Sequence, residues 1–158
     1  HYTNVGKSHL AGVETMCKVQ INRHINVHGA YNYLYTSKDA DGVRLSSSSP
    51  HSGNIRAEYN TRIPRYATVV NLSGNIMGKK RFDVLDELEI EGKKVEAYYQ
   101  AKVNPYCLWD LTVSQYIMQN LRITAGITNL FDYTSDRVTF NTSTSPGRNY
   151  FIACNYTL

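Results

Sequence analysis

The stretch 98–133, YYQAKVNPYCLWDLTVSQYIMQNLRITAGITNLFDY, alternates between apolar and polar residues on both sides of a short polar turn at 116–120. Strict alternation places successive side chains on opposite faces of a β-strand. The first strand is predicted to carry on its apolar face Tyr99, Ala101, Val103, Pro105, Cys107, Trp109, Leu111 and Val113. The return strand is predicted to carry Leu121, Ile123, Ala125 and Ile127. Both strands are long enough to cross a bilayer when tilted, so we predict a membrane-spanning β-ribbon.

The same alternation recurs along the chain and predicts seven strands in all, namely 9–21, 26–35, 54–60, 69–76, 99–113, 121–128 and 149–158. Short connections at 22–25, 62–66 and 116–120 alternate with long ones at 38–52, 83–97 and 134–146. Outer-membrane barrels have short periplasmic turns and long extracellular loops. Single-chain bacterial barrels have an even strand number, and an open sheet edge cannot be satisfied by lipid. Seven strands therefore predict an arc of a larger barrel.

The composition agrees with a barrel and argues against several other classes. Thirteen Tyr accompany four Phe and one Trp, and tyrosine suits a membrane interface. Tyr31, Tyr33 and Tyr35 share one strand face and predict part of an aromatic girdle. The net charge of +4 comes from scattered basic residues, so no nucleic-acid surface is predicted. The chain opens on His1, which we interpret as leader removal or as a piece of something longer.

The three cysteines, Cys17, Cys107 and Cys154, each occupy an apolar position of a predicted strand. Their spacing matches no metal-ligand pattern, and their strands are not sequence neighbours. We expect unpaired thiols packed as small hydrophobic side chains.

Four short motifs, taken in order, carry a family resemblance. They are Asn4-Val5-Gly6-Lys7 followed by Ala11-Gly12-Val13-Glu14, then Leu108-Trp109-Asp110-Leu111-Thr112, then Asn129-Leu130-Phe131-Asp132, and last Ser145-Pro146-Gly147-Arg148-Asn149-Tyr150. Together they resemble the C-terminal part of TonB-dependent outer-membrane receptors over nearly the whole chain. Leu158 departs from the pattern, because an aromatic residue usually ends these chains, although Tyr156 lies two positions earlier on the same face.

The resemblance implies an all-β fold, a transmembrane antiparallel β-barrel of about 22 strands with a plugged lumen. Residues 1–158 would be about seven C-terminal strands, with the plug domain and the earlier strands outside this chain. The implied partners are outer-membrane lipid and lipopolysaccharide, the remainder of the barrel with its plug, and the TonB complex, which binds a missing N-terminal part. The implied ligand is a scarce small-molecule nutrient such as a ferric siderophore, haem or cobalamin.

Candidate functional residues fall into two groups. Asn129 and Asp132 are expected to brace a strand end, because Asn and Asp side chains bond nearby backbone amides. Pro146 and Gly147 suit the turn into the last strand, and Arg148 is expected at the lipid headgroup boundary. For ligand contact we name the loop residues Lys38, Arg44 and His51.

Catalytic and metal chemistry have no support in the residues. We find no Ser/His/Asp elbow, phosphate loop or Cys/His cluster, so no enzyme and no cofactor is predicted. A haem-ligating role for His28 or His51 stays open as an alternative, as does the pair His24 and His28.

Two alternatives from other classes remain. One is a small self-contained outer-membrane barrel acting as an adhesin, which would need an eighth strand. The other is a soluble β-sandwich binding or adhesion domain, in which Val103, Leu111, Ile123 and Ile152 would pack on one another in a closed core.

Overall fold

The computed structural model describes residues 9–37, 49–90, 93–118, 120–134 and 147–157, and for 81–101 it describes the backbone alone. The chain divides into two compact units by its contacts. The first comprises His1–Glu14, Asn32–Ser52 and Met77–Tyr106, and the second comprises Thr15–Tyr31, Gly53–Ile76 and Cys107–Leu158. Among the described residues, no helix has the length and apolarity needed to span a membrane.

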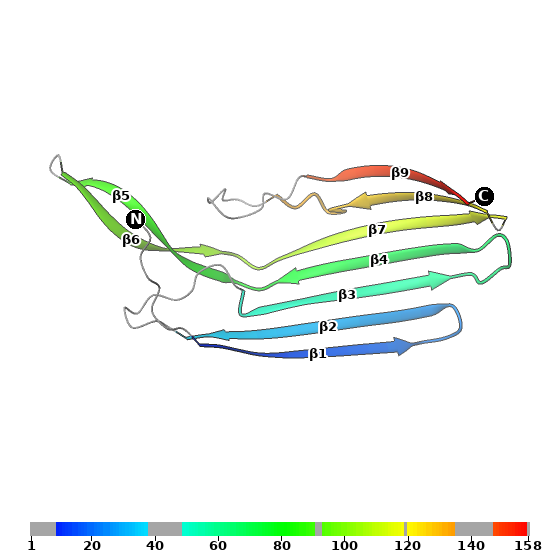
Figure 1. Ribbon diagram of the computed structural model, residues 1–158, viewed down its shortest axis with the longest axis horizontal. Helices are drawn as coiled ribbons and strands as arrows, with labels where there is room; N and C mark the ends of the chain where they lie inside the picture. The colour runs from blue at the N-terminus through cyan, green and yellow to red at the C-terminus, as the bar shows by residue number, and fades with distance from the viewer. Residues whose placement is uncertain (1–8, 38–48, 91–92, 119, 135–146, 158) are drawn as a thin grey trace. The chain divides into compact units, whose positions relative to one another are not determined.

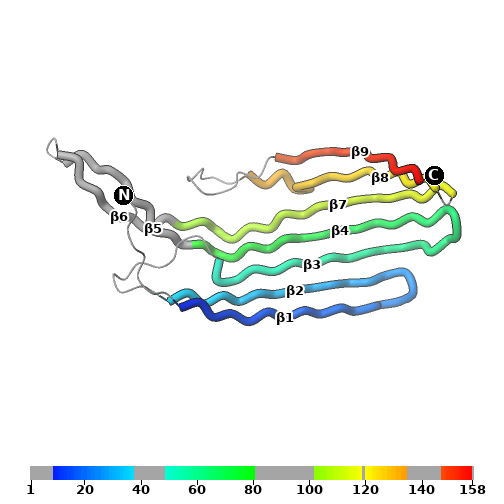
Figure 2. Tube along the Cα trace, viewed as in Figure 1, coloured from blue at the N-terminus to red at the C-terminus, as the bar shows by residue number. Residues whose placement is uncertain are grey.

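A seven-stranded antiparallel sheet in the order β1-β2-β3-β4-β7-β8-β9 contains the seven strands expected from the sequence (Figure 1). Its strands are β1 (Leu10–Gln20), β2 (Ile25–Thr36), β3 (His51–Asn60), β4 (Thr68–Met77), β7 (Tyr106–Ile117), β8 (Leu121–Thr128) and β9 (Asn149–Tyr156). Figure 2 traces β4 and β7 as neighbours. In the sequence, 28 residues separate the end of β4 at Met77 from the start of β7 at Tyr106. The prediction of an all-β fold with an antiparallel sheet is confirmed.

The register of β7, β8 and β9 aligns residues of like polarity across the sheet. Leu111 lies opposite Ile127, and Ile123 lies opposite Cys154. On the other parity, Ser114 lies opposite Thr124, and their hydroxyl oxygens are 2.8 Å apart. Because strand side chains alternate between the two faces, this register gives one apolar face and one largely polar face.

The apolar face is exposed. Ile152 is 81% exposed and Ile123 is 39% exposed, whereas Val103 is the buried hydrophobic residue among those described, at 7% exposure. A sandwich would bury these side chains against a second sheet, so the alternative of a closed soluble core is wrong. An exposed apolar sheet face is the arrangement that a membrane-spanning wall requires.

The cysteines are free, but they are less covered than expected. Cys17 and Cys154 are exposed, and Cys107 is half-buried. The prediction that all three pack as small hydrophobic groups is wrong for Cys17 and Cys154. Both lie on strands at the ends of the seven-stranded order, where each strand has one described neighbour.

The segment 83–97 is predicted as a long loop, but residues 83–90 and 93–97 of it are strand. β5 (Lys80–Ile90) and β6 (Lys93–Val103) form an antiparallel two-stranded sheet. Their register places Phe82 opposite Ala101 and Val84 opposite Tyr99. The prediction of a loop was wrong because strands can carry both charge signs, and the alternation of this segment is that of a strand.

The long strand predicted over 99–113 is also interrupted. β6 ends at Val103 and β7 begins at Tyr106, with Asn104 and Pro105 between them. Proline has no backbone N–H to donate to a ladder, and it restricts the residue before it. The placement of Pro105 within the apolar face of one continuous strand was therefore wrong.

Two glycines leave room for aromatic rings, one on each face of the sheet. A Cβ added to Gly74 on β4 would lie 2.9 Å from Cζ3 of Trp109 on β7. A Cβ added to Gly126 on β8 would lie 2.3 Å from the Phe151 ring, which β9 supplies. Each ring covers a strand position that has no side chain of its own, a known way of fixing register.

Candidate functional site

Three of the sequence motifs meet where β8 ends and β9 begins. The Asn129 N–H donates to Oδ1 of Asp110 from β7 at 2.9 Å, and the Leu130 N–H donates to the Trp109 carbonyl at 2.6 Å. The Arg148 N–H donates to Oδ1 of Asp132 at 2.7 Å. We call Asp110, Asn129, Asp132 and Arg148 the loop-base brace, because the last bond joins the two ends of the 134–146 connection.

Asn129 is the centre of this brace. Its Nδ2 donates to the Tyr133 carbonyl at 2.7 Å, and its Oδ1 accepts from the Tyr133 N–H at 2.8 Å. The Asp132 N–H donates to the Asn129 carbonyl at 2.8 Å. Asn129 is 5% exposed and is the buried polar residue among those described. Its amide thus satisfies backbone groups that the end of β8 leaves without ladder partners.

The backbone of the brace explains why Asn and Asp occur here. Asn129 has φ of 52° and Asp132 has φ of 56°, both in the left-handed region. Asn and Asp tolerate that region better than other side chains because they bond to local backbone groups. A Cβ added to Gly147 would lie 3.0 Å from Oδ1 of Asp132, so glycine lets the chain approach this carboxylate.

Arg148 also bonds through its side chain. A hydrogen bond with Tyr150, followed by the charge interactions with Tyr150 and Asp132, raises the pKa of the fully exposed Arg148 guanidinium. Desolvation lowers this pKa, and by more than the charge of Asp132 raises it. In the brace, carboxylates accept hydrogen bonds from backbone N–H groups, and Arg148 supplies a cation. This arrangement positions the polypeptide chain and does not suit proton transfer.

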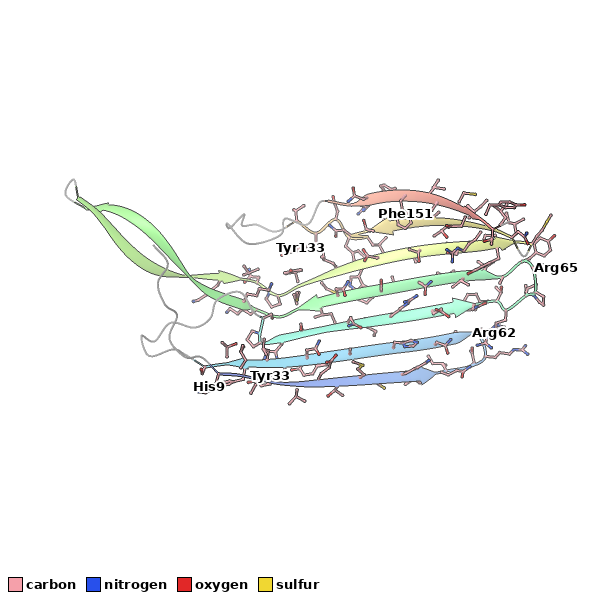
Figure 3. All side chains as sticks on the ribbon, in the orientation of Figure 1. His9, Tyr33, Arg62, Arg65, Tyr133 and Phe151 are labelled. Carbon is pink, nitrogen blue, oxygen red and sulfur yellow. The ribbon has the colours of Figure 1, made fainter. Side chains whose placement is uncertain are left out.

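Of the predicted ligand contacts, His51 lies in the described part of the chain. It is the first residue of β3, so its assignment to the 38–52 loop was wrong. Its carbonyl accepts from the Gly78 N–H at 2.8 Å, and its ring centroid lies 5.2 Å from that of Tyr33. Lys38, Arg44 and Pro146 lie outside the described residues. Figure 3 labels Tyr33, near the end of β2, and His9, just before β1 begins.

The histidines give no converging metal site among the residues that the structure describes, where no group of three His, Cys, Asp or Glu side chains is placed to hold an ion. Both ring nitrogens of His24 are engaged. Nε2 accepts from Arg23 Nε at 2.9 Å, and Nδ1 lies 2.8 Å from the Asn60 carbonyl. His24 is thus held at a turn by Arg23 and Asn60.

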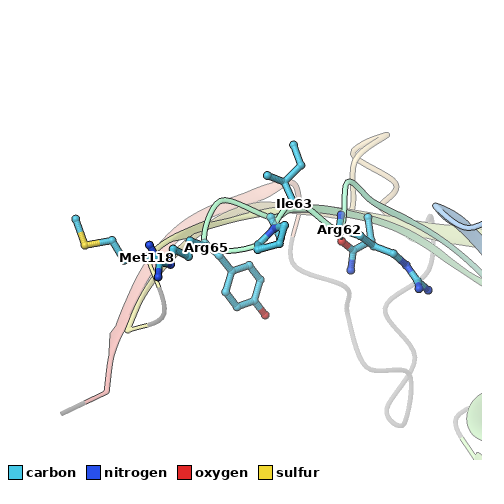
Figure 4. Close-up of a pocket in the computed structure, with 8 residues that line it drawn as sticks. Arg62, Ile63, Arg65 and Met118 are labelled. Carbon is cyan, nitrogen blue, oxygen red and sulfur yellow. Dashed lines mark hydrogen bonds between the residues drawn. The ribbon is translucent and has the colours of Figure 1, made fainter.

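A hollow of about 380 Å³ lies at the turns after β3 and β7, and it is not among the features predicted from the sequence. It is lined by Asn60, Arg62, Ile63, Pro64, Arg65, Ala67, Tyr116 and Met118. Figure 4 shows Arg65 beside Met118, while Arg62 points to the other side of the turn from Ile63. The available signal was Ile-Pro-Arg-Tyr, in which Pro64 begins a turn.

Comparisons with known proteins give a consistent fold. The family model described as "TonB dependent receptor-like, beta-barrel" matches residues 1–130. The ferripyoverdine receptor of the outer membrane of Pseudomonas aeruginosa, bound to ferripyoverdine, has a TM-score of 0.74 at 18% identity, over 94% of this chain and 19% of that chain. The ferric enterobactin receptor from the same organism has a TM-score of 0.71 at 19% identity, over 97% of this chain and 23% of that chain.

A third solved structure, the FpvAI–pyocin S2 complex, has a TM-score of 0.72 at 17% identity. The match covers 94% of this chain and 19% of that chain. A comparison with curated protein sequences finds no match. The chain thus spans about a fifth of the length of the solved receptors, and at these identities the likeness shows the fold.

Proposed function

Because the chain belongs to the TonB-dependent receptor β-barrel family, which places it in the bacterial outer membrane, we propose that it forms wall strands of a nutrient receptor. The receptor would take up a scarce nutrient by TonB-dependent transport. The family match over residues 1–130 carries this proposal. The exposed apolar face of the seven-stranded sheet supports it, because such a face is stable against hydrocarbon and costly in water.

Within that receptor this chain contributes the C-terminal part of the barrel, and other parts of the protein contribute the earlier strands and the plug. The polar parity of the sheet, with Arg56 and Glu58 forming an ion pair at 3.9 Å, suits a lumen that contacts the plug. TonB would bind a segment N-terminal to these strands. The 38–48 and 134–146 connections and the β5–β6 ribbon would lie on the extracellular side.

We propose a ferric siderophore as the first ligand class to test, with haem and cobalamin as the other candidates. The solved neighbours are receptors for ferripyoverdine and ferric enterobactin, which supports this order. Lys38, Arg44 and His51 are the residues of this chain proposed to contact ligand. Two of them are cationic, and cations attract the negative charge that many iron-binding ligands carry.

The test uses the gene for the whole receptor in its own bacterium. Deleting the gene is expected to reduce uptake of one radiolabelled nutrient among ferric siderophores, haem and cobalamin, and a protonophore is expected to abolish the difference. The Lys38→Ala/Arg44→Ala/His51→Ala variant should raise the ligand concentration needed for uptake. Arg23→Ala, at the short turn after β1, is the matched control and should leave uptake unchanged.

Unchanged uptake of every nutrient after deletion would overturn the transport proposal. Loss of uptake in the deletion strain, combined with normal uptake in the triple variant, would retain transport and reject the three contact residues. The two proposals are therefore tested separately.

A further inference from the structure

Three basic side chains lie in one row across the neighbouring strands β1, β2 and β3 (Figure 1). The Ile21 N–H donates to the Ile25 carbonyl at 3.0 Å, where β1 turns into β2. In that antiparallel register Lys18 lies opposite His28. Residues directly opposite each other share a face of the sheet, so these two side chains are neighbours.

The row continues from β2 to β3. The Asn60 N–H donates to the His24 carbonyl at 2.8 Å. That register places Arg56 opposite His28. Neighbouring strands are about 4.8 Å apart, so Lys18 and Arg56 occupy positions about 10 Å apart with an imidazole between them. We call Lys18, His28 and Arg56 the basic row. Bonds at the outer ends of the two strand pairs keep the same registers, from the Ser37 N–H to the His9 carbonyl and from the Leu34 N–H to the Pro50 carbonyl.

The basic row lies on the polar face of the sheet. Cys17 and Ile55 are sequence neighbours of its members and are exposed on the apolar face, and successive strand side chains point to opposite faces. In a barrel whose apolar face meets lipid, the basic row therefore lines the lumen. Receptor barrels of this size have a filled lumen, and a charge covered there is destabilising unless an opposite charge meets it.

Arg56 has contacts within the sheet, but they leave donors over. Its Nε and Nη2 donate to Oδ1 of Asn71 at 3.3 and 3.0 Å, and its Nη2 lies 3.9 Å from Oε2 of Glu58. The ion pair is open to solvent, because the Arg56 and Glu58 side chains are 55% and 31% exposed. A guanidinium has five N–H donors, so Arg56 can bond a further acceptor.

Lys18 has no such partner. It is exposed and makes no hydrogen bond or ion pair with a residue that the structure describes, and the same holds for the half-buried His28 ring. Glu14, on the same face of β1, is about 13 Å away along the strand. Among the described residues, the carboxylate of Glu58 is thus the one beside a row that carries two fixed positive charges.

The same face of β7 and β8 is different in character. Thr112 lies opposite Gly126 there. Ser114 lies opposite Thr124, and their hydroxyl oxygens are 2.8 Å apart. These positions are small and uncharged. A protein segment that fills the lumen therefore meets positive charge at β1–β3 and neutral hydroxyl groups at the middle of β7 and β8.

We propose that an acidic side chain from the part of the receptor that fills the lumen binds to the basic row. Its carboxylate would lie between Lys18 and Arg56, within reach of the His28 ring. This inference rests on the proposed function, because it requires a barrel wall around a filled lumen. It adds the residues of the wall that hold the filling segment and the charge that this segment must carry.

Two observations favour a resident carboxylate over an anionic nutrient in transit. The lumen is filled at rest, so the charge on Lys18 needs a partner that is always present. The basic row also lies near the short turns. Lys18 is eight residues, about 26 Å, from the outer end of β1 at Leu10. A ligand held by the outer connections would not reach it.

The test uses the whole receptor in outer-membrane vesicles, treated with a carbodiimide. This reagent joins an amine and a carboxylate in direct contact as an amide, with loss of water, and peptide mass spectrometry identifies the joined residues. Lys18 is expected to be joined to one acidic residue outside residues 1–158. Lys18→Arg keeps the positive charge and removes the reactive amine, so it should abolish that product and leave the urea midpoint of the receptor unchanged.

Two lysine substitutions locate the carboxylate. Arg56→Lys, in a Lys18→Arg background, moves the amine to the other end of the basic row and should be joined to the same acidic residue. Thr124→Lys, in the same background, is the matched control, because it places an amine on the same face of β8. Its product with that acidic residue should be at least about tenfold less abundant, since β4 and β7 separate β8 from β3 by about 14 Å.

A charge exchange tests whether the contact stabilises the receptor. Lys18→Glu should lower the urea midpoint of the whole receptor, because two carboxylates then face each other. Changing the identified acidic residue to lysine in the same receptor should restore most of the midpoint. A Lys18 side chain that acted only by filling space would not be rescued in this way.

Three results would overturn the proposal. The first is the absence of any product that joins Lys18 to a residue outside 1–158, including the case in which Lys18 is joined only to Glu14 or Glu58. The second is an equal yield from Thr124→Lys, which would mean that carboxylates line the whole lumen. The third is a product that forms only when a ferric siderophore is added, which would assign the basic row to a nutrient in transit.

These results are separable from those of the uptake experiment. Loss of uptake after gene deletion, without the Lys18 product, would retain transport and reject the carboxylate contact. The Lys18 product in a receptor whose deletion leaves uptake unchanged would retain the contact and reject transport.

Discussion

Replacing Asn129 tests whether the loop-base brace stabilises the barrel wall. Its side-chain amide makes two hydrogen bonds with the Tyr133 backbone, at 2.7 and 2.8 Å, in a 5% exposed position. Each such bond contributes about 1 kcal/mol net. Alanine also fits the left-handed φ of 52° less well than asparagine, by about 1 kcal/mol. Asn129→Ala should therefore lower the free energy of unfolding by about 3 kcal/mol.

Asn129→Gly separates the two contributions, because glycine accepts the positive φ and has no amide. Asn129→Gly should lower the free energy of unfolding by about 2 kcal/mol. This loss is smaller than that of Asn129→Ala, although glycine lacks the methyl group that alanine keeps. Asn149→Ala is the matched control. Its Nδ2 donates one exposed bond to the Gly147 carbonyl at 2.9 Å, so the loss should stay under about 1 kcal/mol.

The measurement is urea unfolding of the whole receptor folded into phospholipid vesicles, followed by circular dichroism and by gel mobility without boiling. Equal costs for Asn129→Ala and Asn129→Gly would show that the left-handed backbone contributes nothing. A cost for Asn129→Ala no greater than for Asn149→Ala would refute the idea that the amide holds the end of β8.

Three further predictions concern the two faces of the sheet and one turn. Gly126→Ala should cost about 1–2 kcal/mol, because the new methyl displaces the Phe151 ring, and the cost should shrink in a Phe151→Ala background, as double-mutant unfolding would measure. A bimane label on Cys154 should be quenched by nitroxide lipids, whereas a label on Ala153→Cys, on the opposite parity, should not; equal quenching would contradict the assigned faces. Met118→Gly should leave the urea midpoint unchanged or raise stability by up to about 1 kcal/mol, since it relieves a positive φ; a larger loss would mean that its side chain packs.

The strands of the sheet could be predicted because alternation is a local property. Ile123 lies opposite Cys154 and Leu111 opposite Ile127, as the apolar parity of each strand requires. A shift of one residue would turn every apolar side chain to the polar face, so the pattern determines the register as well as the strand.

The β5–β6 ribbon shows where a composition argument fails. Its residues carry both charge signs, which favoured a loop, yet the register places Val84 opposite Tyr99 and Leu88 opposite Val95. Pro105 shows the reverse error, because alternation was continued through a residue that cannot donate to a ladder. In the β5–β6 ribbon, the alternation of residues predicts strand better than the charge does. At Pro105, the missing backbone N–H ends the strand even though the alternation continues.

The candidate sites depend on contacts that the sequence does not contain. Asn129 bonding to Tyr133 is a local contact that residue type already indicates. The bond from Asn129 to Asp110 exists because β7 and β8 pair in a particular register, and the bond from Arg148 to Asp132 spans a long connection. The positive φ of Arg65 could not be predicted, because the third residue of such a turn after proline is usually glycine or asparagine.

The bond between Arg148 and Asp132 has a consequence for how the connection 134–146 can vary in sequence. It joins the ends of the 134–146 connection next to the paired start of β9, where Thr128 lies opposite Asn149. The entropy of closing a connection grows only slowly with its length, so longer or different sequences between 134 and 146 cost little once the base is held. The sequence of the connection can therefore change without a change in the strand pairing. A sheet built this way can accept a different connection between β8 and β9 while the strands keep their register.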